Sequence, residues 1–381
     1  MSLRFHSCLL LINPSRYPKM VRALERRLRG ATGVELVVTK SKTHFLDCAR
    51  EFVDGPYRNL LVWGGDGTAH DAINALYPAL RDSESGEAKA VGFLRGGTGN
   101  GIQDSYEVPY RLSTQLATYA RSTRNRYTIS VDLIRVDDGV NVRYGQLVGV
   151  GLDAEILERR ERRRRKHADG QEISQSGVIR YIVAGISRFF AGDLKQSRSI
   201  WDIELCEGKY AFRGPRVNAA FPIARLTMKR SPLMIEVGTR PYYGKLFRVC
   251  PDVVCNDGNI DLYLYDFSSR AEILRNLVYL WTGWHSMINR RLSRARKPVI
   301  ERYQVREARI ESELPFDYHI DGELLRVEPT TDGQIPALGM KVVPEAMTFL
   351  VPAAFYHIFH PFAGNPDIPD VRLEPVVGQQ Q

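Results

Sequence analysis

The stretch LLVWGGDGTAHDAIN, residues 60–74, decides the fold of this chain. It begins with an apolar run, Leu60–Trp63, and continues through the cluster Gly64-Gly65-Asp66-Gly67-Thr68. An amphipathic pattern with helical spacing follows and extends to Leu76. The stretch therefore predicts a buried strand, a glycine-rich turn and a helix.

The junction between this strand and helix is a predicted anion site. The first N–H groups of a helix have no intrahelical acceptor, and the helix dipole is positive there. Glycines at 64, 65 and 67 let a phosphate approach the main chain, and Thr68 can cap the helix or donate its hydroxyl. Asp66 would repel a phosphate directly, so it predicts a divalent cation that bridges the two. A plain Gly-Asp-Gly turn is the alternative.

A second stretch, AVGFLRGGTGN at residues 90–100, repeats the design. An apolar run again ends in glycines, here Gly96-Gly97-Thr98-Gly99-Asn100. If both runs are parallel strands of one sheet, both turns lie at its carboxyl edge, where open α/β folds bind ligands. The two turns are therefore expected to face a single cleft.

A third mark, Asn13-Pro14, follows the first apolar strand. An N-P turn, then GGDGT, then GTGN in that order resembles the diacylglycerol kinase catalytic family, which also holds sphingosine, ceramide and bacterial lipid kinases. The resemblance runs from about Leu9 to Pro352. It implies an α/β fold, with an N-terminal parallel-sheet nucleotide-binding domain and a second, mostly antiparallel, sandwich-like β-rich domain. It also implies an ATP-dependent lipid kinase that uses Mg²⁺.

The resemblance implies roles for particular residues. Glu323, within FDYHIDGELL at 316–325, would accept a proton, and Asp321 would orient the loop or metal-bound waters. By its residues alone this stretch reads as a plain hairpin turn that needs no function. Asp66 would act in catalysis and hold the metal. The nucleotide-contacting set is Asn13, Pro14, Thr39, Gly64, Gly65, Asp66, Gly67, Thr68, Gly97, Thr98, Gly99 and Asn100.

A second, structural Mg²⁺ site is implied at Asn256-Asp257-Gly258-Asn259. Asp257 would bind the ion together with main-chain oxygens of Val254 and Asn259. A simple Asx turn is the alternative. The chain also departs from many bacterial members, because Gly101 follows GTGN and the next acidic residue is Asp104. The acceptor lipid, diacylglycerol-like or sphingoid, therefore stays open.

Hydrophobic periodicity divides the chain into segments. We expect an ATP-binding α/β domain over 1–125, a β-rich lipid-binding domain over 126–338, return strands over 339–360 and a flexible tail over 361–381. The strands expected in the second domain are 127–136, 140–150, 200–206, 210–213, 233–237, 246–249 and 260–265, with a turn at 207–209. Helical insertions are expected at 155–191 and 270–292.

The composition limits the partners. The net charge of +9 favours an anionic partner, yet no base-stacking pattern indicates nucleic acid. The basic run Arg159–Lys166 and a second cluster over 290–297 suggest contact with an anionic membrane, with a solvated surface as the alternative. Five cysteines without metal-ligand spacing, and no apolar stretch of bilayer length, favour a cytoplasmic, peripherally membrane-associated protein. A homodimer stays open.

Two rival functions remain at this point. NAD kinases and other small-molecule kinases can also carry GGDGT, although the GTGN turn and the apolar β strands argue against them. A catalytically silent nucleotide- or membrane-binding protein could use the same fold.

Overall fold

The computed structural model describes residues 2–12, 18–83, 88–97, 99–155, 157–158, 199–211, 218–243 and 247–362. Several sequence predictions lie outside these residues: those for Asn13, Pro14, Thr98, the basic run Arg159–Lys166, nearly all of the 155–191 insertion and the tail after residue 362.

The N-terminal part is a parallel sheet with helices between its strands, in the spatial order β4-β3-β1-β2. Strands β3 and β4 are buried because helices pack against the sheet, β3 along its whole length, whereas the edge strand β2 is only partly covered. The elements are β1 (Arg4–Ile12), α1 (Pro18–Leu28), β2 (Thr32–Val38), α2 (Lys42–Asp54), β3 (Asn59–Gly64), α3 (Asp66–Asp82), β4 (Ala90–Arg95), α4 (Gly101–Ser105) and α5 (Leu112–Asn125).

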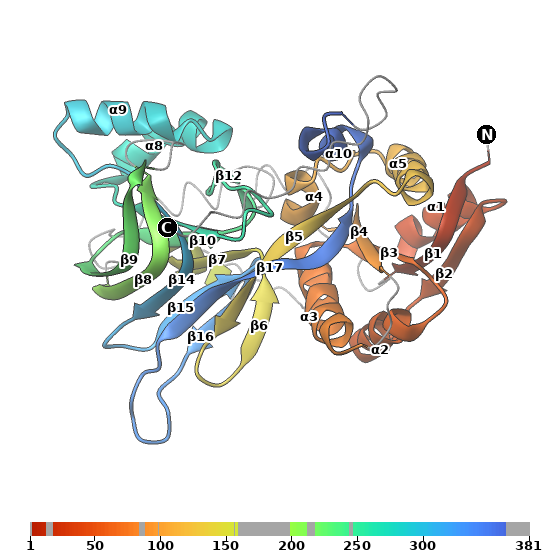
Figure 1. Ribbon diagram of the computed structural model, residues 1–381, viewed down its shortest axis with the longest axis horizontal. Helices are drawn as coiled ribbons and strands as arrows, with labels where there is room; N and C mark the ends of the chain where they lie inside the picture. The colour runs from red at the N-terminus through yellow and green to blue at the C-terminus, as the bar shows by residue number, and fades with distance from the viewer. Residues whose placement is uncertain are drawn as a thin grey trace, which may run out of the picture.

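The second part is antiparallel and β-rich, with α8 and α9 beside it (Figure 1). The predicted fold class is therefore confirmed. Its elements are β5 (Thr128–Asp137), β6 (Val142–Gly145), β7 (Leu147–Gly151), β8 (Trp201–Ala211), β9 (Asn218–Arg230), β10 (Met234–Gly238), β11 (Tyr242–Tyr243), β12 (Phe247–Arg248), β13 (Ile260–Tyr265), α8 (Arg270–Thr282), α9 (His285–Arg294), β14 (Glu301–Glu311), β15 (Phe316–Ile320), β16 (Glu323–Val327), β17 (Leu338–Leu350) and α10 (Ala353–Phe359).

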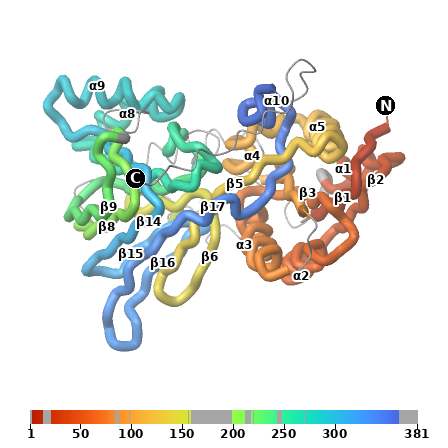
Figure 2. The backbone as a smooth tube through the Cα atoms, in the orientation of Figure 1, coloured from red at the N-terminus to blue at the C-terminus, as the bar shows by residue number. Residues whose placement is uncertain are grey.

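Strand β17 joins the two parts into one sheet. It pairs with β14 and β5 in antiparallel fashion, and near its end Phe349 pairs with Val91 of β4 in parallel. Figure 2 shows the red and orange N-terminal part at one end of the molecule and the green and cyan strands and helices at the other. Strand β17 contributes to both hydrophobic cores, since its Met347 packs in the N-terminal core and its Met340 in the β-rich core.

The strands β7, β10 and β15 have two different faces. One face is apolar and packs in the β-rich core through residues such as Val148, Val237 and Ile320. The opposite face carries Glu236 and His319, which are buried although they are polar. Because side chains alternate along a strand, these two residues belong to one surface of the sheet. Arg240 follows the end of β10 and is buried as well.

Some expected strands in the second part were wrong. The predicted turn at Glu207-Gly208-Lys209 is instead the middle of β8, which runs unbroken from Trp201 to Ala211. Gly208 is there because a Cβ would overlap with β14, so the glycine allows a close approach between strands and makes no turn. The sequence reading also missed β9 and β14, which pair with β8 on either side.

Two further predicted segments, 140–150 and 270–292, each contain two elements in the structure. The strand predicted over 140–150 is split into β6 and β7, because the N–H of Gln146 bonds the Asp321 carboxylate at 3.2 Å. The helical insertion predicted over 270–292 is confirmed and consists of two helices, α8 and α9, which meet at Gly283; this glycine has a φ of 76° and caps α8 in the left-handed conformation. In the first part, α3 begins at Asp66 with Gly65 as its N-cap, so Thr68 does not cap it.

Candidate functional site

The two glycine turns lie against each other, as predicted. They follow β3 and β4, which are parallel neighbours, and the N–H of Gly96 donates to the carbonyl of Gly64 at 2.8 Å. A Cβ on Gly65 would stand 2.9 Å from the Cα of Gly97, and a Cβ on Gly97 would come closer still to Gly65. Only glycine permits this distance between the two main chains.

Asn100 closes the second turn with its own side chain. Its Oδ1 accepts the N–H of Gly97 at 3.0 Å, and its Nδ2 donates to the carbonyl of Gly97 at 2.8 Å. Asn100 also has a φ of 64°, a left-handed conformation that asparagine tolerates better than most residues. Its buried amide therefore shapes the loop.

Asp66 connects the two turns. Its Oδ1 accepts the N–H of Ile102 in the first turn of α4 at 3.2 Å, and its Oδ2 lies so close to Gly99 that a Cβ there would overlap with it. Burial raises the pKa of the Asp66 carboxyl, while the Arg240 charge and the bond from Ile102 oppose the shift. The carboxylate is thus surrounded by the second turn, α4 and Arg240.

One face of α3 reaches the β-rich part. His70 follows Asp66 by one helical turn and Asn74 follows His70 by another. The Asn74 side chain accepts the N–H of Tyr144 in β6 at 2.9 Å and donates to the Tyr144 carbonyl at 2.8 Å. Buried His70 lies with Nδ1 3.6 Å from Oδ2 of Asp321 and Nε2 3.8 Å from Oε2 of Glu323.

The β15–β16 hairpin carries both of those carboxylates. Asp321 and Gly322 form its turn with φ values of 52° and 87°, so Glu323 begins the second strand. The Asp321 carboxylate accepts the N–H of Leu147 at 3.1 Å and an N–H of Arg240 at 3.0 Å. Burial alone would raise the pKa of Asp321, but Arg240 and His70 hold it below its usual value. Asp321 therefore stays ionised and fixes the hairpin.

Glu323 is the more accessible of the two, with 41% of its side chain exposed. Its position at the rim contrasts with Asp321, whose side chain is fully buried. Lys42, at the start of α2, lies near enough for the Glu323 charge to raise its pKa, although its hydrogen bond to Asp71 contributes more. The Lys42–Asp71 pair has an N–O distance of 2.8 Å, with Lys42 62% and Asp71 23% exposed.

A triphosphate fits the first turn. No atom lies within 4 Å of a Cβ built on Gly67, so there is open space at the N-terminus of a 17-residue helix whose first N–H groups point outward. Asp66 is the carboxylate of this region that would hold a magnesium ion, since its Oδ2 faces Gly99 in the second turn, whereas Asp321 is bonded to Arg240.

Other predicted residues lie elsewhere or serve the scaffold. The hydroxyl of Thr39 donates to the carbonyl of Ile12 at 2.9 Å, which fixes the end of β2 against β1. Thr68 packs over Gly64. Asp104 forms a buried ion pair with Arg95, with an N–O distance of 2.6 Å.

The acidic turn at Asp257 has the hydrogen bonds of an Asx turn. Its Oδ1 accepts the N–H of Asn259 at 3.1 Å, and its Oδ2 accepts the side chain of Gln304 at 2.8 Å. Val254 is half-exposed beside it. These hydrogen bonds are those of a simple Asx turn, and the structural magnesium site at Asp257 stays a prediction.

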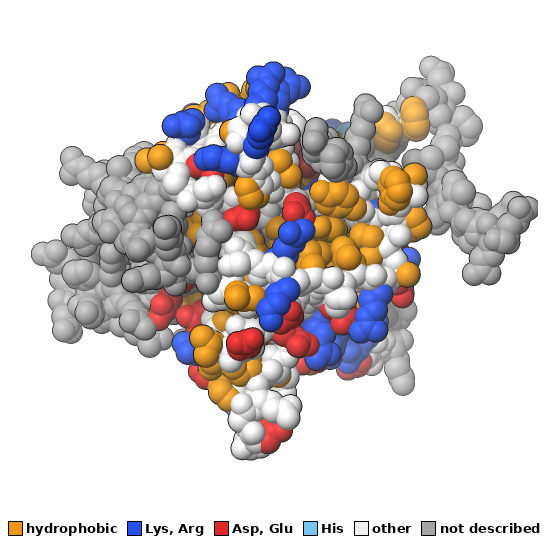
Figure 3. All heavy atoms as spheres, turned by 90° about the vertical axis from the view of Figure 1, so that its left-hand side faces the viewer, with side chains coloured by type: hydrophobic (Ala, Val, Ile, Leu, Met, Phe, Trp, Pro, Cys, Tyr) orange, Lys and Arg blue, Asp and Glu red, His pale blue; other side chains and the backbone are white. Residues whose placement is uncertain are grey.

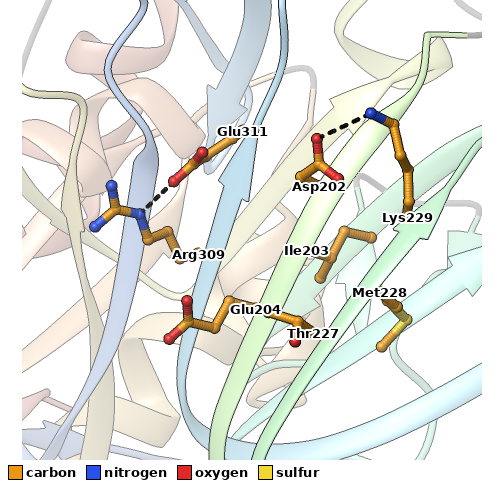
Figure 4. Close-up of a pocket in the computed structure, with 8 residues that line it drawn as sticks. All are labelled: Asp202, Ile203, Glu204, Thr227, Met228, Lys229, Arg309 and Glu311. Atoms are coloured by element: carbon orange, nitrogen blue, oxygen red, sulfur yellow. Dashed lines mark hydrogen bonds and ion pairs between the residues drawn. The ribbon is translucent and has the colours of Figure 1, made fainter.

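A hollow of about 240 Å³ lies on the outer side of β8, β9 and β14 (Figure 4). Its charged side chains pair with one another, Arg309 with Glu311 at 2.7 Å and Lys229 with Asp202 at 3.5 Å. It contains no glycine and lies at the far end of the molecule from β3 and β4 (Figure 1). Nothing in it suits a nucleotide.

Two family profiles match the chain. Residues 7–136 match the profile described as the diacylglycerol kinase catalytic domain, and residues 217–351 match the YegS C-terminal NAD kinase beta sandwich-like domain. The chain therefore carries a diacylglycerol kinase catalytic domain and a YegS-type C-terminal domain. The first match includes both glycine turns, and the second includes Arg240, Asp321 and Glu323.

Relatives and solved structures agree with these domain matches. Two curated proteins named diacylglycerol kinase, from Mycobacterium tuberculosis strains CDC 1551 / Oshkosh and ATCC 25618 / H37Rv, are each 23% identical over 228 residues. The matches cover 59% of this chain and 60% of each relative. A crystal structure titled as a putative diacylglycerol kinase from Bacillus anthracis str. Sterne has a TM-score of 0.59 at 15% identity and covers 92% of this chain and 98% of its own. A second Bacillus anthracis structure, titled as a diacylglycerol kinase, has a TM-score of 0.56. These structures share the fold.

The sequence reading missed two residues of this site. His70 stands in the quoted stretch, four positions after Asp66, so helical spacing could have placed it on the same face. Arg240 had no local signal, because its burial beside Asp321 depends on the pairing of β10 with β7. Among the described residues, we find no helix with the length and apolarity that a membrane crossing requires.

Proposed function

We propose that this chain is an ATP-dependent lipid kinase that phosphorylates a hydroxyl of a diacylglycerol-like or sphingoid lipid. Residues 1–125 hold the nucleotide and residues 126–338 hold the lipid. One observation carries the proposal: α3, which begins at the GGDGT turn, places His70 between the two carboxylates of the DGE hairpin. The phosphate-binding turn and a carboxylate that can accept a proton are thereby brought to one place.

The chain's own groups divide the work of phosphoryl transfer. The N–H groups at the start of α3, with the open space beside Gly67 giving access, bind phosphate oxygens without a side chain in the way. Asp66 would hold a magnesium ion, which would supply positive charge against the phosphates. Lys42, exposed at the rim, adds a second positive charge on the Glu323 side of the site.

Glu323 accepts the proton of the lipid hydroxyl as the hydroxyl oxygen bonds to the terminal phosphorus and the bond to the leaving diphosphate breaks. Its 41% exposure leaves the carboxylate open to an incoming substrate. His70 is a positioning residue, because it contacts Glu323 from the buried side and is itself fixed by its place in α3. General base catalysis of this kind contributes about 10²–10⁴-fold in rate.

The lipid comes from an anionic membrane surface that the α8–α9 surface contacts. We define this surface as Leu274, Val278 and Trp281 of α8, Trp284 of the following turn, and Arg290, Arg294 and Arg296 in and after α9. The three α8 side chains share one helical face and are 49%, 64% and 55% exposed, whereas an outward helix face is ordinarily polar. Lys and Arg side chains gather over α9 in Figure 3.

This combination suits a lipid headgroup layer. Tryptophans favour the membrane interface, and each Lys or Arg near an anionic leaflet contributes about 1 kcal/mol. Not every basic residue of α9 is available, since Lys297 pairs with Glu272 at 2.6 Å and Arg291 stacks on Tyr279.

Label transfer from γ-labelled ATP tests the activity. The purified chain is incubated with Mg²⁺ and either mixed lipids or NAD, and label is measured in the organic and aqueous phases. Label in lipid supports the proposal, and label on NAD would overturn it. Glu323→Gln is expected to lower turnover about 10²–10⁴-fold. Glu328→Gln is the matched control, an exposed carboxylate that follows the same hairpin and pairs with Arg326 at 3.0 Å. Equal turnover of the two variants would remove Glu323 from the mechanism.

Tryptophan fluorescence tests the membrane surface. Trp63 and Trp201 are buried, while Trp281 and Trp284 are 55% and 60% exposed, so a blue shift on adding anionic vesicles reports on the α8–α9 surface. Binding is expected to weaken as salt is raised, because exposed charges are screened. In vesicle sedimentation, which does not need these tryptophans as reporters, Trp281→Ser with Trp284→Ser should abolish vesicle binding, and Leu314→Ser, at a 70% exposed site elsewhere, should not. Equal binding by both variants would refute this surface.

A further inference from the structure

Three polar side chains form a buried cluster on the strands next to the site. His319 of β15 and Glu236 of β10 both pair in register with Gly149 of β7, one from each side. Asp153 follows β7 and returns over the same glycine. The cluster thus lies over three adjacent strands, and Arg240 and Asp321 follow the ends of two of them.

Gly149 makes the space for the cluster. A Cβ at this position would overlap with Oδ2 of Asp153 and Nε2 of His319, so no other residue fits there. Asp153, Glu236 and His319 each offer one ligand atom, and these atoms all lie within 4.8 Å of one another. Glu236 and His319 are fully buried, and Asp153 is 5% exposed.

The hydrogen bonds of the cluster are incomplete. Asp153 and His319 contact each other through Oδ2 and Nε2. Glu236 is different, because no donor within the described residues reaches either of its carboxylate oxygens, and it could bond the neighbouring Asp153 carboxylate only if it carried a proton. A buried carboxylate without a donor is costly, and a cation in the middle of the cluster would supply what both oxygens lack.

We propose that Asp153, Glu236 and His319 bind a divalent transition-metal ion. Two carboxylates and one imidazole suit Zn²⁺ and Mn²⁺, and the two negative charges balance such an ion. His319 precedes Asp321 by two residues on β15, so the ion would fasten the strand that carries the site hairpin to β7 and β10. This site is separate from the magnesium assigned to Asp66, and it does not depend on the proposed kinase activity.

A proton network is the rival arrangement. The same three groups are neutral overall when Glu236 carries a proton and His319 is an imidazolium beside ionised Asp153. The two arrangements therefore differ in that one divalent ion takes the place of two protons, one on Glu236 and one on His319. Glu236→Gln separates the two, because glutamine has nearly the shape of a protonated glutamate but removes a charged ligand.

Metal content and thermal unfolding of the full chain test the proposal. The chelator-stripped protein is dialysed against limiting Zn²⁺ or Mn²⁺, and bound metal is counted by mass spectrometry. We expect about one equivalent in the wild type, with a rise in melting temperature, and loss of both in Glu236→Gln and His319→Gln. His357→Gln with His360→Gln, which removes two exposed histidines of the α10 region, is the control and should keep its equivalent.

Three results would overturn the site. They are no metal in the wild type, full retention of metal by folded Glu236→Gln, or loss of metal only in the His357/His360 control. If a variant fails to fold, Co²⁺ added to the wild type decides the matter, because an N/O-ligated buried ion gives visible d–d absorption that Zn²⁺ abolishes by competition. Absence of that absorption would also refute the proposal.

Discussion

Breaking the Arg240–Asp321 pair should damage both stability and turnover. The two side chains are 2% and 0% exposed and lie 3.0 Å apart, so Asp321→Asn leaves a buried guanidinium charge without its counter-charge. Removing one partner of a buried ion pair costs about 3–5 kcal/mol in the free energy of unfolding. The Asp321 carboxylate accepts the N–H groups of Gln146 and Leu147 with its two oxygens. Asparagine has a single acceptor oxygen, so the substitution also weakens these hydrogen bonds.

A double-mutant cycle in urea measures this interaction. Trp201 is buried in the β-rich core, so its fluorescence follows unfolding of that part. Arg240→Met alone should also destabilise the protein, but adding it to Asp321→Asn should cost much less than the sum, with a coupling of about 2 kcal/mol or more. Additive free energies would refute the argument that these charges compensate each other.

The Arg302–Asp261 pair provides the matched control. It is equally buried, with an N–O distance of 2.6 Å, but it lies on β13 and β14 away from the glycine turns. Asp261→Asn should lower stability by a similar amount and leave the turnover of the folded fraction unchanged. If Asp321→Asn also retains normal turnover, the pair is only part of the scaffold.

Burial lowers the pKa of His285 to about 3, so below pH 6.5 the unfolded chain binds a proton that the native chain does not, and stability falls by about 1.4 kcal/mol per pH unit. His285→Phe should therefore lose about 2.3 kcal/mol less than the wild type between pH 6.5 and 4.5 in urea titrations, since the unfolded histidine is already half protonated at pH 6.5, and equal losses would show that His285 is not kept neutral. Gly97→Ala should abolish ATP binding in calorimetry while Gly333→Ala, a change in an open exposed turn, should not, because only the first overlaps with Gly65. Ser41→Ala should cost about 1 kcal/mol of stability, since its side chain accepts the N–H of His44 and caps α2, and an unchanged unfolding midpoint would contradict that role.

Local patterns gave the N-terminal part with few errors. Each strand there is a short apolar run that ends at a glycine or turn signal, and each helix has an apolar face, so consecutive elements could be read one at a time. The β-rich part was harder to predict because glycine has different roles at different positions of it. Gly208 looked like a turn and is a close contact between strands, and Gly149 makes room for a polar cluster that lies above it.

The sequence by itself determined that two buried parallel strands end in adjacent glycine turns, because a handful of neighbouring residues fix the backbone conformation there. Only the tertiary structure decided which side chains meet those turns. Asp321 and Glu323 reach His70 across about 250 residues of chain, and Arg240 reaches Asp321, because the order and register of β7, β10 and β15 bring them together. Register over such separations depends on the packing of the whole sheet, which no short stretch of sequence contains.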